Sequence, residues 1–275
     1  MQDNGSTPVL KLIESRYDWI TATARKDGLG GDLFEFGIAQ MEASADAGAQ
    51  QRAWYFQGYT GFHAGNWSVG WGREGAIVVA TQEASEVGYR TLANLADHWS
   101  RCDVCVTGVD ESNQFSPVDQ YWQLVKPGTK RSAHAPVCTV ILNSKGGETF
   151  YQGQRSAAFY MRVYNKHVES DGEYPRGAWR YELEMKRHAS ENEQERIKRE
   201  VTRLIPPTDV IATELVRQGL PVPWPNNAPV DRAKMPPRRK EVERTLTWLQ
   251  DQVAPSVEYA TRAAGVKRVR EALKL

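Results

Sequence analysis

The stretch from Ser156 to Lys166 constrains the fold of this chain more than any other, because apolar and polar side chains alternate along it. In an extended strand, successive side chains point to opposite faces of a sheet. One face is apolar and the other groups two phenols with two cations: Phe159, Met161 and Val163 against Tyr160, Arg162, Tyr164 and Lys166. A strand that only covers a core can leave its second face to any solvated residues. This one combines nucleophiles with groups that bind phosphate, so chemistry is expected here.

Two more segments, Arg101–Thr107 and Trp179–Lys186, have the same two-faced pattern. Their polar faces carry mainly charged groups: Arg101, Asp103, Cys105 and Thr107 on the first, and Arg180, Glu182, Glu184 and Lys186 on the second. Aspartate is unfavourable in a strand, so Asp103 is expected either to be exposed on an edge strand or to hold a ligand. If the three strands belong to one antiparallel sheet with its other side on the core, their polar groups converge on one open face.

The rest of the chain predicts an α+β protein with a mainly antiparallel sheet, one open polar face carrying the active site, and helices on the other face. A first strand is expected at Tyr17–Thr23, three short strands between Trp54 and Val79, and a buried strand at Val137–Leu142. Apolar spacing predicts helices at 32–49, 84–99, 191–204 and 208–219 and from about 238 onward. We therefore expect an α+β domain over residues 1–190 and a helical, basic region over residues 191–275, which can pack on the same domain.

Charge is distributed unevenly along the chain. Residues 1–150 carry 12 Lys and Arg against 17 Asp and Glu, a net charge of −5, whereas residues 151–275 carry 23 against 17, a net charge of +6. The basic half fits a polyanion partner, although a solvated surface gives the same imbalance. No segment has the roughly 18 to 20 apolar residues of a spanning helix, so no membrane contact is expected and a cytoplasmic location is predicted. The pair Cys102 and Cys105 lies in a strand-like run and is expected to be reduced core cysteines.

Two or three carboxylates in one patch repel each other, and a hard divalent cation with oxygen ligands, Mg²⁺ or Mn²⁺, relieves the repulsion. Such an ion polarises a phosphate oxygen, cations offset developing charge, and a phenol attacks phosphorus. Because a free tyrosine has a pKa of about 10, its phenolate needs the metal or a cation such as Lys166. The residues alone leave other interpretations open. Tyr164 fits a surface tyrosine, Tyr160 is a competing nucleophile, and Glu182 and Glu184 can pair with Arg180 and Lys186 across a solvated sheet.

Four segments of the chain resemble the replication initiation factors of rolling-circle plasmids and filamentous phages, and their order and spacing along the chain match that family as well. The family includes relaxases of some integrative conjugative elements. The most specific of the four segments runs from Tyr151-x-Gly153-x-Arg155-Ser156 into Arg162-Val163-Tyr164-Asn165-Lys166 with Glu169. The others are Arg101-Cys102-Asp103-Val104, Arg180-Tyr181-Glu182-Leu183-Glu184-Met185-Lys186 and the helix-like run from Trp248 to Ser256.

The resemblance implies a rolling-circle replication initiator. A tyrosine would nick origin DNA, remain joined to the 5′ phosphate and free a 3′ hydroxyl that primes synthesis. It implies the following roles: Tyr164 as nucleophile with Lys166 beside it, Asp103, Glu182 and Glu184 as ligands of Mg²⁺ or Mn²⁺, and Arg155, Arg162, Arg180 and Lys186 as DNA contacts. Related tyrosine nucleases hold metal with a His-hydrophobic-His pair. This chain has none, since its histidines lie at 63, 98, 134, 167 and 188.

The partners implied are origin DNA, as a hairpin or supercoiled duplex, and a helicase from the host or the element, and the pattern allows a homodimer. Three alternatives remain at this stage: a non-catalytic DNA-binding regulator with the same fold, a conjugative relaxase, and a metal nuclease that uses water instead of tyrosine.

Overall fold

The computed structural model describes residues 10–129, 136–144, 146–186, 205–225 and 268. The chain divides into two compact units, Met1–Ala233 and Lys234–Leu275, and every element named below belongs to the first. The described residues form one ten-stranded antiparallel sheet and five helices, so the predicted α+β class is confirmed. None of the described helices is long and apolar enough to cross a membrane.

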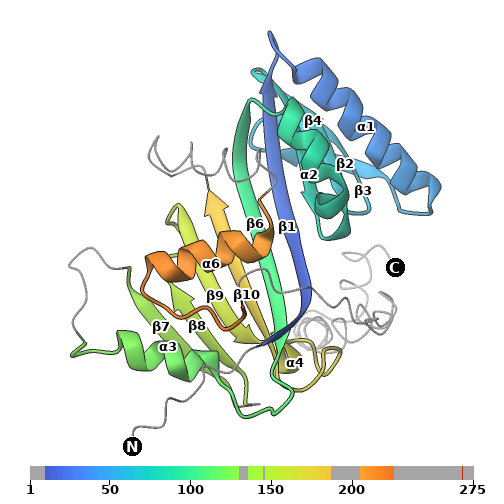
Figure 1. Ribbon diagram of the computed structural model, residues 1–275. Coiled ribbons are helices and arrows are strands. Elements are labelled where there is room, and N and C mark those ends of the chain that lie inside the picture. Colours follow the sequence, from blue (N-terminus) through green and yellow to red (C-terminus); the bar gives the residue numbers. More distant parts are fainter. Residues whose placement is uncertain (1–9, 130–135, 145, 187–204, 226–267, 269–275) are drawn as a thin grey trace, which may run out of the picture. The chain divides into compact units, whose positions relative to one another are not determined.

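The sheet has the strand order β2-β3-β4-β5-β1-β6-β10-β9-β8-β7, and every neighbouring pair is antiparallel. The strands are β1 (Lys11–Arg25), β2 (Arg52–Phe56), β3 (Tyr59–Ala64), β4 (Trp67–Trp71), β5 (Gly75–Thr81), β6 (His98–Val109), β7 (Cys138–Leu142), β8 (Glu148–Gln152), β9 (Phe159–Asn165) and β10 (Ala178–Lys186). The long strands β1 and β6 lie in the middle, which is plain in Figure 1, and join the two halves of the sheet.

The helices are α1 (Gly30–Asp46), α2 (Glu83–Leu95), α3 (Pro117–Val125), α4 (Lys166–Glu169) and α6 (Pro207–Arg217). In Figure 1, α1 lies beside β4 and β5, α2 beside β1 and β5, α3 beside β7 and β8, and α6 beside β6, β1 and β10. The helix α6 and the segment after it are integral to the fold, because Ile211, Leu215 and Trp224 are buried in the same core as the sheet. The predicted boundary at residue 190, the predicted helix 191–204 and almost all of the region from 238 onward lie outside the described residues.

The four longer helices, α1, α2, α3 and α6, pack on one apolar face of the sheet. Met161 and Val163 of β9, Leu183 of β10 and Val104 of β6 are buried in a single cluster with side chains from α1, α2, α3 and α6. Burial of each such side chain stabilises the fold by roughly 1.5–3 kcal/mol. The alternation along β6, β9 and β10 therefore has the expected cause: their apolar faces pack against helices, and their polar faces share the other side.

Two details of the sheet differ from expectation. The segment 54–79 forms parts of four strands rather than three, because Gln57 and Gly58 (φ 49° and 87°) make a tight hairpin between β2 and β3. A two-residue turn with both φ values positive matches the right-handed twist of the strands it joins.

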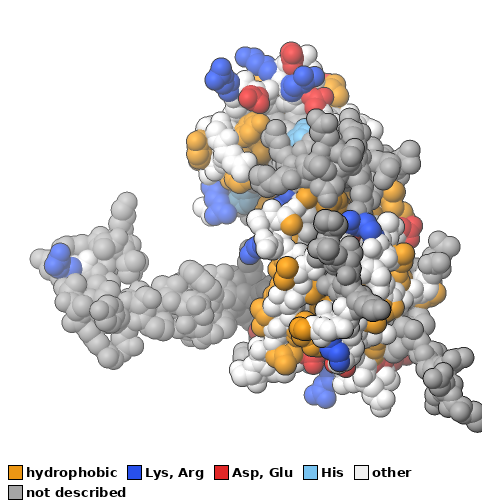
Figure 2. Space-filling view, turned by 90° about the vertical axis from the view of Figure 1, so that its left-hand side faces the viewer, with side chains coloured by type: hydrophobic (Ala, Val, Ile, Leu, Met, Phe, Trp, Pro, Cys, Tyr) orange, Lys and Arg blue, Asp and Glu red, His pale blue; other side chains and the backbone are white. Residues whose placement is uncertain are grey.

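The strand predicted to be buried at Val137–Leu142 is instead the edge strand β7. Its side chains Ile141 and Leu142 are exposed. Figure 2 views the side on which β7 lies in Figure 1, and it shows hydrophobic side chains at the surface there. The continuous apolar run is typical of a buried strand, but the position of a strand in the sheet order depends on contacts that one segment does not encode.

Candidate active site

The polar faces of β6, β10 and β9 lie side by side, because these strands are consecutive in the sheet. In their register, Glu184 lies opposite both Asp103 and Tyr160, Glu182 opposite Arg162, and Arg180 opposite Tyr164. Directly opposite residues in neighbouring strands have Cβ atoms about 5 Å apart. The strands β9 and β10, together with the distant β6, thus bring together the tyrosine, the carboxylates and most of the cations that the sequence singled out.

Tyr164 donates a hydrogen bond to Glu182, with 2.6 Å between its hydroxyl oxygen and Oε1 of the carboxylate. The other oxygen of Glu182 accepts a hydrogen bond from Arg162. Burial and the negative charge of Glu182 raise the pKa of Tyr164 well above its usual value, against the opposing effect of Arg180. The free phenolate is therefore scarce at neutral pH, and a proton acceptor is already in place at the hydroxyl.

Asp103 lies on an interior strand, so the edge-strand explanation for this residue is excluded. Its carboxylate accepts two hydrogen bonds from Arg101, at 2.9 Å to Nε and 2.6 Å to Nη2, and Arg101 also lies 3.6 Å from Glu184. Burial, joined by the charges of Glu184 and Glu182, raises the pKa of Asp103 to about 7 despite Arg101. Burial therefore outweighs the stabilising effect of Arg101 on the Asp103 carboxylate.

The predicted DNA contacts are placed differently from one another. Arg155 is exposed in the loop between β8 and β9, and Arg162 is half-buried. Lys186 pairs with Glu184 at 2.5 Å and also donates to the backbone oxygen of Arg155 at 2.5 Å. Arg180 is only 4% exposed, so it lies within the fold rather than on its surface.

Lys166 is the first residue of α4 rather than the last of the strand. Its Nζ pairs with Glu169 at 2.5 Å and lies 5.7 Å from the centre of the Tyr164 ring. It is therefore close to the predicted nucleophile, but its ion pair is made with a neighbour on its own helical turn.

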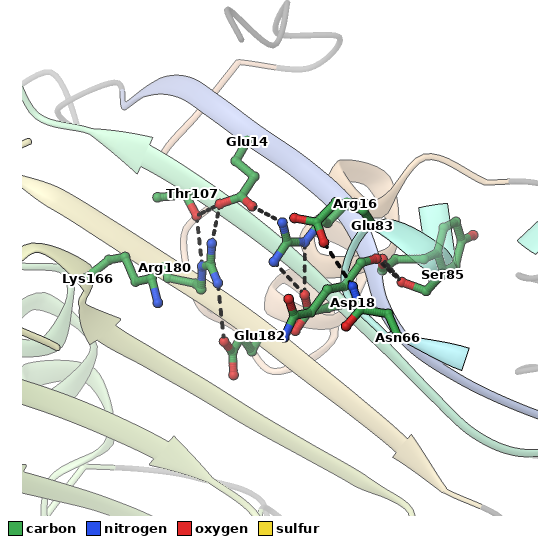
Figure 3. Close-up of polar contacts among 12 residues, drawn as sticks. Glu14, Arg16, Asp18, Asn66, Glu83, Ser85, Thr107, Lys166, Arg180 and Glu182 are labelled. Carbon is green, nitrogen blue, oxygen red and sulfur yellow. Dashed lines mark hydrogen bonds and ion pairs between the residues drawn. The ribbon is translucent and has the colours of Figure 1, made fainter. Parts of the chain in front are cut away.

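Arg180 belongs to a buried network that the sequence did not indicate, shown in Figure 3. Its Nε donates to Thr107 at 3.0 Å, its Nη2 donates to Glu14 and to the Tyr174 hydroxyl, and its Nη1 lies 3.9 Å from Glu182. Glu14 also accepts from Thr107 at 3.0 Å and from Tyr174 at 2.9 Å. Arg180 and its partners thus connect Glu14 on β1 to Glu182, the carboxylate that accepts the hydrogen bond from Tyr164.

Arg16 completes this network, since it pairs with Glu14 at 2.7 Å and with Asp18 at 2.6 Å. Ile20 is a core residue. If side chains alternated regularly along β1, Arg16 and Asp18 would point to the core as well. A register shift between Tyr17 and Trp19 breaks that alternation. A β-bulge of this kind re-aims side chains and cannot be located from side-chain alternation alone.

The predicted metal ligands fit a divalent cation in their chemistry. Asp103 and Glu184 face each other across neighbouring strands, and their oxygens are the donors that Mg²⁺ and Mn²⁺ prefer. However, no group of three His, Cys, Asp or Glu side chains in the described part of the chain is arranged to hold a metal ion. Glu182, the third predicted ligand, is directed to Tyr164 and Arg162 instead.

Cys105 lies on the polar face, directly opposite Glu182 in the register of β6 and β10, whereas Cys102 is buried in the apolar core. Cys102 and Cys105 are buried free thiols, as expected. His167 makes a 2.7 Å contact through Nδ1 with the backbone oxygen of Tyr174, so its ring is engaged with the turn that follows α4.

Comparisons with known proteins give one informative result. No protein-family model matches the chain, and no curated protein matches it. Among solved structures, the chain resembles the rolling circle replication initiator protein from Geobacillus stearothermophilus, with a TM-score of 0.52 and 19% sequence identity, over 74% of this chain and 84% of that one. The chain therefore has a fold like that of a solved rolling-circle replication initiator.

Proposed function

We propose that this protein initiates rolling-circle replication by nicking origin DNA, with Tyr164 as the nucleophile. The observation that carries the proposal is the 2.6 Å hydrogen bond from the Tyr164 hydroxyl to Glu182, on the polar face of the sheet. A tyrosine in such a site needs a base within hydrogen-bond reach, and Glu182 meets that condition. The similarity of the fold to a rolling-circle initiator supports the same reaction class.

The reaction follows from the state of this pair. Because the pKa of Tyr164 is raised, the phenol keeps its proton until the attack, and Glu182 takes the proton as the phenol oxygen attacks phosphorus. A bond forms between the tyrosine oxygen and the 5′ phosphate, and the bond between phosphorus and the 3′ oxygen breaks. The 3′ oxygen leaves with that electron pair and takes a proton from water, which gives the free 3′ hydroxyl. In the reverse reaction Glu182 returns its proton to the tyrosine oxygen, so the same two residues reseal the strand.

The surrounding residues act on the phosphate and on the base. Arg162 holds Glu182 in place and, being half-buried beside Tyr164, is placed to contact the scissile phosphate. Arg155, in the exposed loop, and Lys186 bind phosphates further along the strand. Arg180 has a different role from the predicted DNA contact, because its buried partners Glu14 and Thr107 make it a residue that positions Glu182.

A divalent cation, Mg²⁺ or Mn²⁺, is part of the proposal, with Asp103 and Glu184 as the residues that would hold it. When bound, such an ion neutralises charge on the phosphate oxygens. The helicase partner and the homodimer stay predictions that derive from the family resemblance.

The test is nicking of supercoiled origin DNA by purified protein in the presence of Mn²⁺. The wild type is expected to convert it to open circles that carry covalently attached protein, and Tyr164→Phe is expected to give none. Tyr55→Phe is the matched control, because Tyr55 is a 74% exposed tyrosine on β2. Nicking by Tyr164→Phe at the wild-type rate would refute the assignment of the nucleophile.

A non-catalytic DNA-binding regulator is the second candidate, favoured by one observation. The carboxylates of the site already pair with cations, as Asp103 does with Arg101 and Glu184 with Lys186. This candidate predicts salt-sensitive DNA binding with no covalent adduct at any metal concentration. A nuclease that uses water would instead cleave without an adduct, and its cleavage would survive loss of both Tyr160 and Tyr164.

A further inference from the structure

Tyr160 and Tyr151 form an aromatic pair on the same face as Tyr164. The two rings are stacked, with 5.8 Å between their centres and 21° between their planes. Both side chains are half-buried, so part of each is open to solvent. In the register of the sheet, Tyr151 of β8 lies opposite Arg162, which is two residues from Tyr160 on β9, so the two tyrosines are diagonal neighbours. A pair that served only as packing would be expected on the apolar face, where the helices lie.

Two arginines lie near this pair, and Glu184 lies opposite Tyr160 on β10. Arg162 lies beside both tyrosines, and the charges of Arg162 and Arg155 both act on the hydroxyl of Tyr160. Arg155 is exposed, and its backbone oxygen accepts a hydrogen bond from Lys186. Aromatic rings next to cations are the combination that binds single-stranded nucleic acid, because bases stack on the rings while the cations follow the phosphates.

The Tyr160 hydroxyl lacks what a nucleophile needs. No described hydrogen bond connects it to a carboxylate, whereas the Tyr164 hydroxyl donates to Glu182. Burial and the neighbouring Tyr151 raise the pKa of Tyr160. Tyr160 and Tyr164 are four positions apart along β9, which corresponds to a distance of roughly 13 Å at 3.3 Å per residue. Tyr160 thus lies near the attacking oxygen but not at it.

We propose that Tyr151 and Tyr160 form a stacking site for one unpaired base of the DNA strand, a few nucleotides from the scissile phosphate. The proposal rests on the proposed function, since it assumes that Tyr164 acts on this strand, and it names the form of the substrate: the strand must be unpaired at this base. The ring of Tyr160, and not its hydroxyl, is what matters. A hairpin loop or locally melted duplex provides such a base, whereas an intact duplex does not.

The test measures binding rather than cleavage, so it is independent of the chemistry. Full-length Tyr164→Phe protein is titrated by fluorescence anisotropy with a labelled single-stranded oligonucleotide that spans the nick sequence, and with copies in which one base at a time is replaced by an abasic site. One abasic position is expected to weaken binding by roughly 5- to 150-fold, the range for loss of one stacked base. Adding Tyr160→Leu should weaken binding to the intact strand similarly, and the abasic change should then have no further effect.

Three further variants make the result specific. Tyr160→Phe keeps the ring, so it is expected to retain the binding that Tyr160→Leu loses. Tyr151→Leu is expected to repeat the effect of Tyr160→Leu. Tyr55→Leu removes an exposed ring from β2 and should leave binding unchanged.

The stacking site is overturned if every abasic position weakens DNA binding by Tyr160→Leu as much as it weakens binding by the Tyr164→Phe parent protein. It is also overturned if Tyr160→Phe binds DNA as poorly as Tyr160→Leu. Failure of the wild type to form any adduct would instead refute the proposed function, and the abasic measurements would still report on the stacking site.

Discussion

Replacing Glu14 by Gln tests the network behind the active site. Arg180 is 4% exposed and pairs with Glu14, its main charged partner, whereas Glu182 lies 3.9 Å away. Removing one partner of a buried ion pair costs about 3–5 kcal/mol, because the other charge is left uncompensated. Glutamine keeps the shape and one acceptor oxygen for Thr107 and Tyr174. We therefore expect a loss at the lower end, about 3 kcal/mol in the free energy of unfolding.

The assay is urea unfolding followed by tryptophan fluorescence, with the exposed Glu35 of α1 changed to Gln as the matched control. The control is expected to stay within about 0.5 kcal/mol of the wild type. Adding Arg180→Met to Glu14→Gln should cost less than the sum of the two single changes, because the unpaired charge is then gone. A cost below about 1 kcal/mol for Glu14→Gln, or strict additivity in the double variant, would refute the view that this pair is buried and coupled.

The same variant has a predictable pH dependence. Burial raises the pKa of Glu14, but Arg180, Arg16, Tyr174 and Thr107 together outweigh it, and the net pKa is lowered from its usual 4.5. The folded state therefore binds this proton less readily than the unfolded state. The extra stability of the wild type over Glu14→Gln is expected to be complete above pH 4.5 and to shrink as the pH falls through the lowered pKa. A difference that grew on acidification would contradict the sign.

Three other changes have expected outcomes. Glu182→Gln should lower the nicking rate by about 10²- to 10⁴-fold, which is the usual contribution of a general base, and should leave DNA binding unchanged. A rate near that of the wild type in single-turnover nicking would show that Glu182 is not the base. If Asp103 holds the metal, Mn²⁺ should raise the thermal unfolding midpoint of the wild type and not of Asp103→Asn, and equal shifts in both would contradict the assignment. Gly61→Ala should cost at least about 2 kcal/mol in urea unfolding, because its new Cβ would lie 1.9 Å from the Val69 backbone oxygen, whereas Gly31→Ala has open space and should cost nothing.

The sheet and its two faces could be predicted because apolar and polar side chains alternate along each of these strands. Met161 and Val163 alternate with Arg162 and Tyr164, and burial of the apolar set fixes which face the polar set must take. The same reasoning placed Asp103 and Glu182 on that face. The choice between the two explanations for Asp103 needed the sheet order, which places its strand in the interior of the sheet.

What the sequence left open depends on contacts between distant segments. Glu14 joins the site only because a bulge near Asp18 turns the first half of β1, and because β6 lies between β1 and β10. The pairing of Tyr164 with Glu182 depends likewise on the register of β9 against β10, which neither strand encodes alone. The exposed Ile141 of β7 shows the same limit, since an apolar run does not say whether its strand is central or at the edge.

The central claim, attack by Tyr164, is tested most directly by locating the covalent bond. Trypsin cleaves after Arg155, Arg162 and Lys166, so Tyr160 and Tyr164 fall in separate peptides, Ser156–Arg162 and Val163–Lys166. After reaction with a nick-site oligonucleotide and digestion of the DNA, mass spectrometry is expected to find the nucleotide phosphate on the peptide Val163–Lys166. Its presence on Ser156–Arg162, or on any other peptide, would contradict the account.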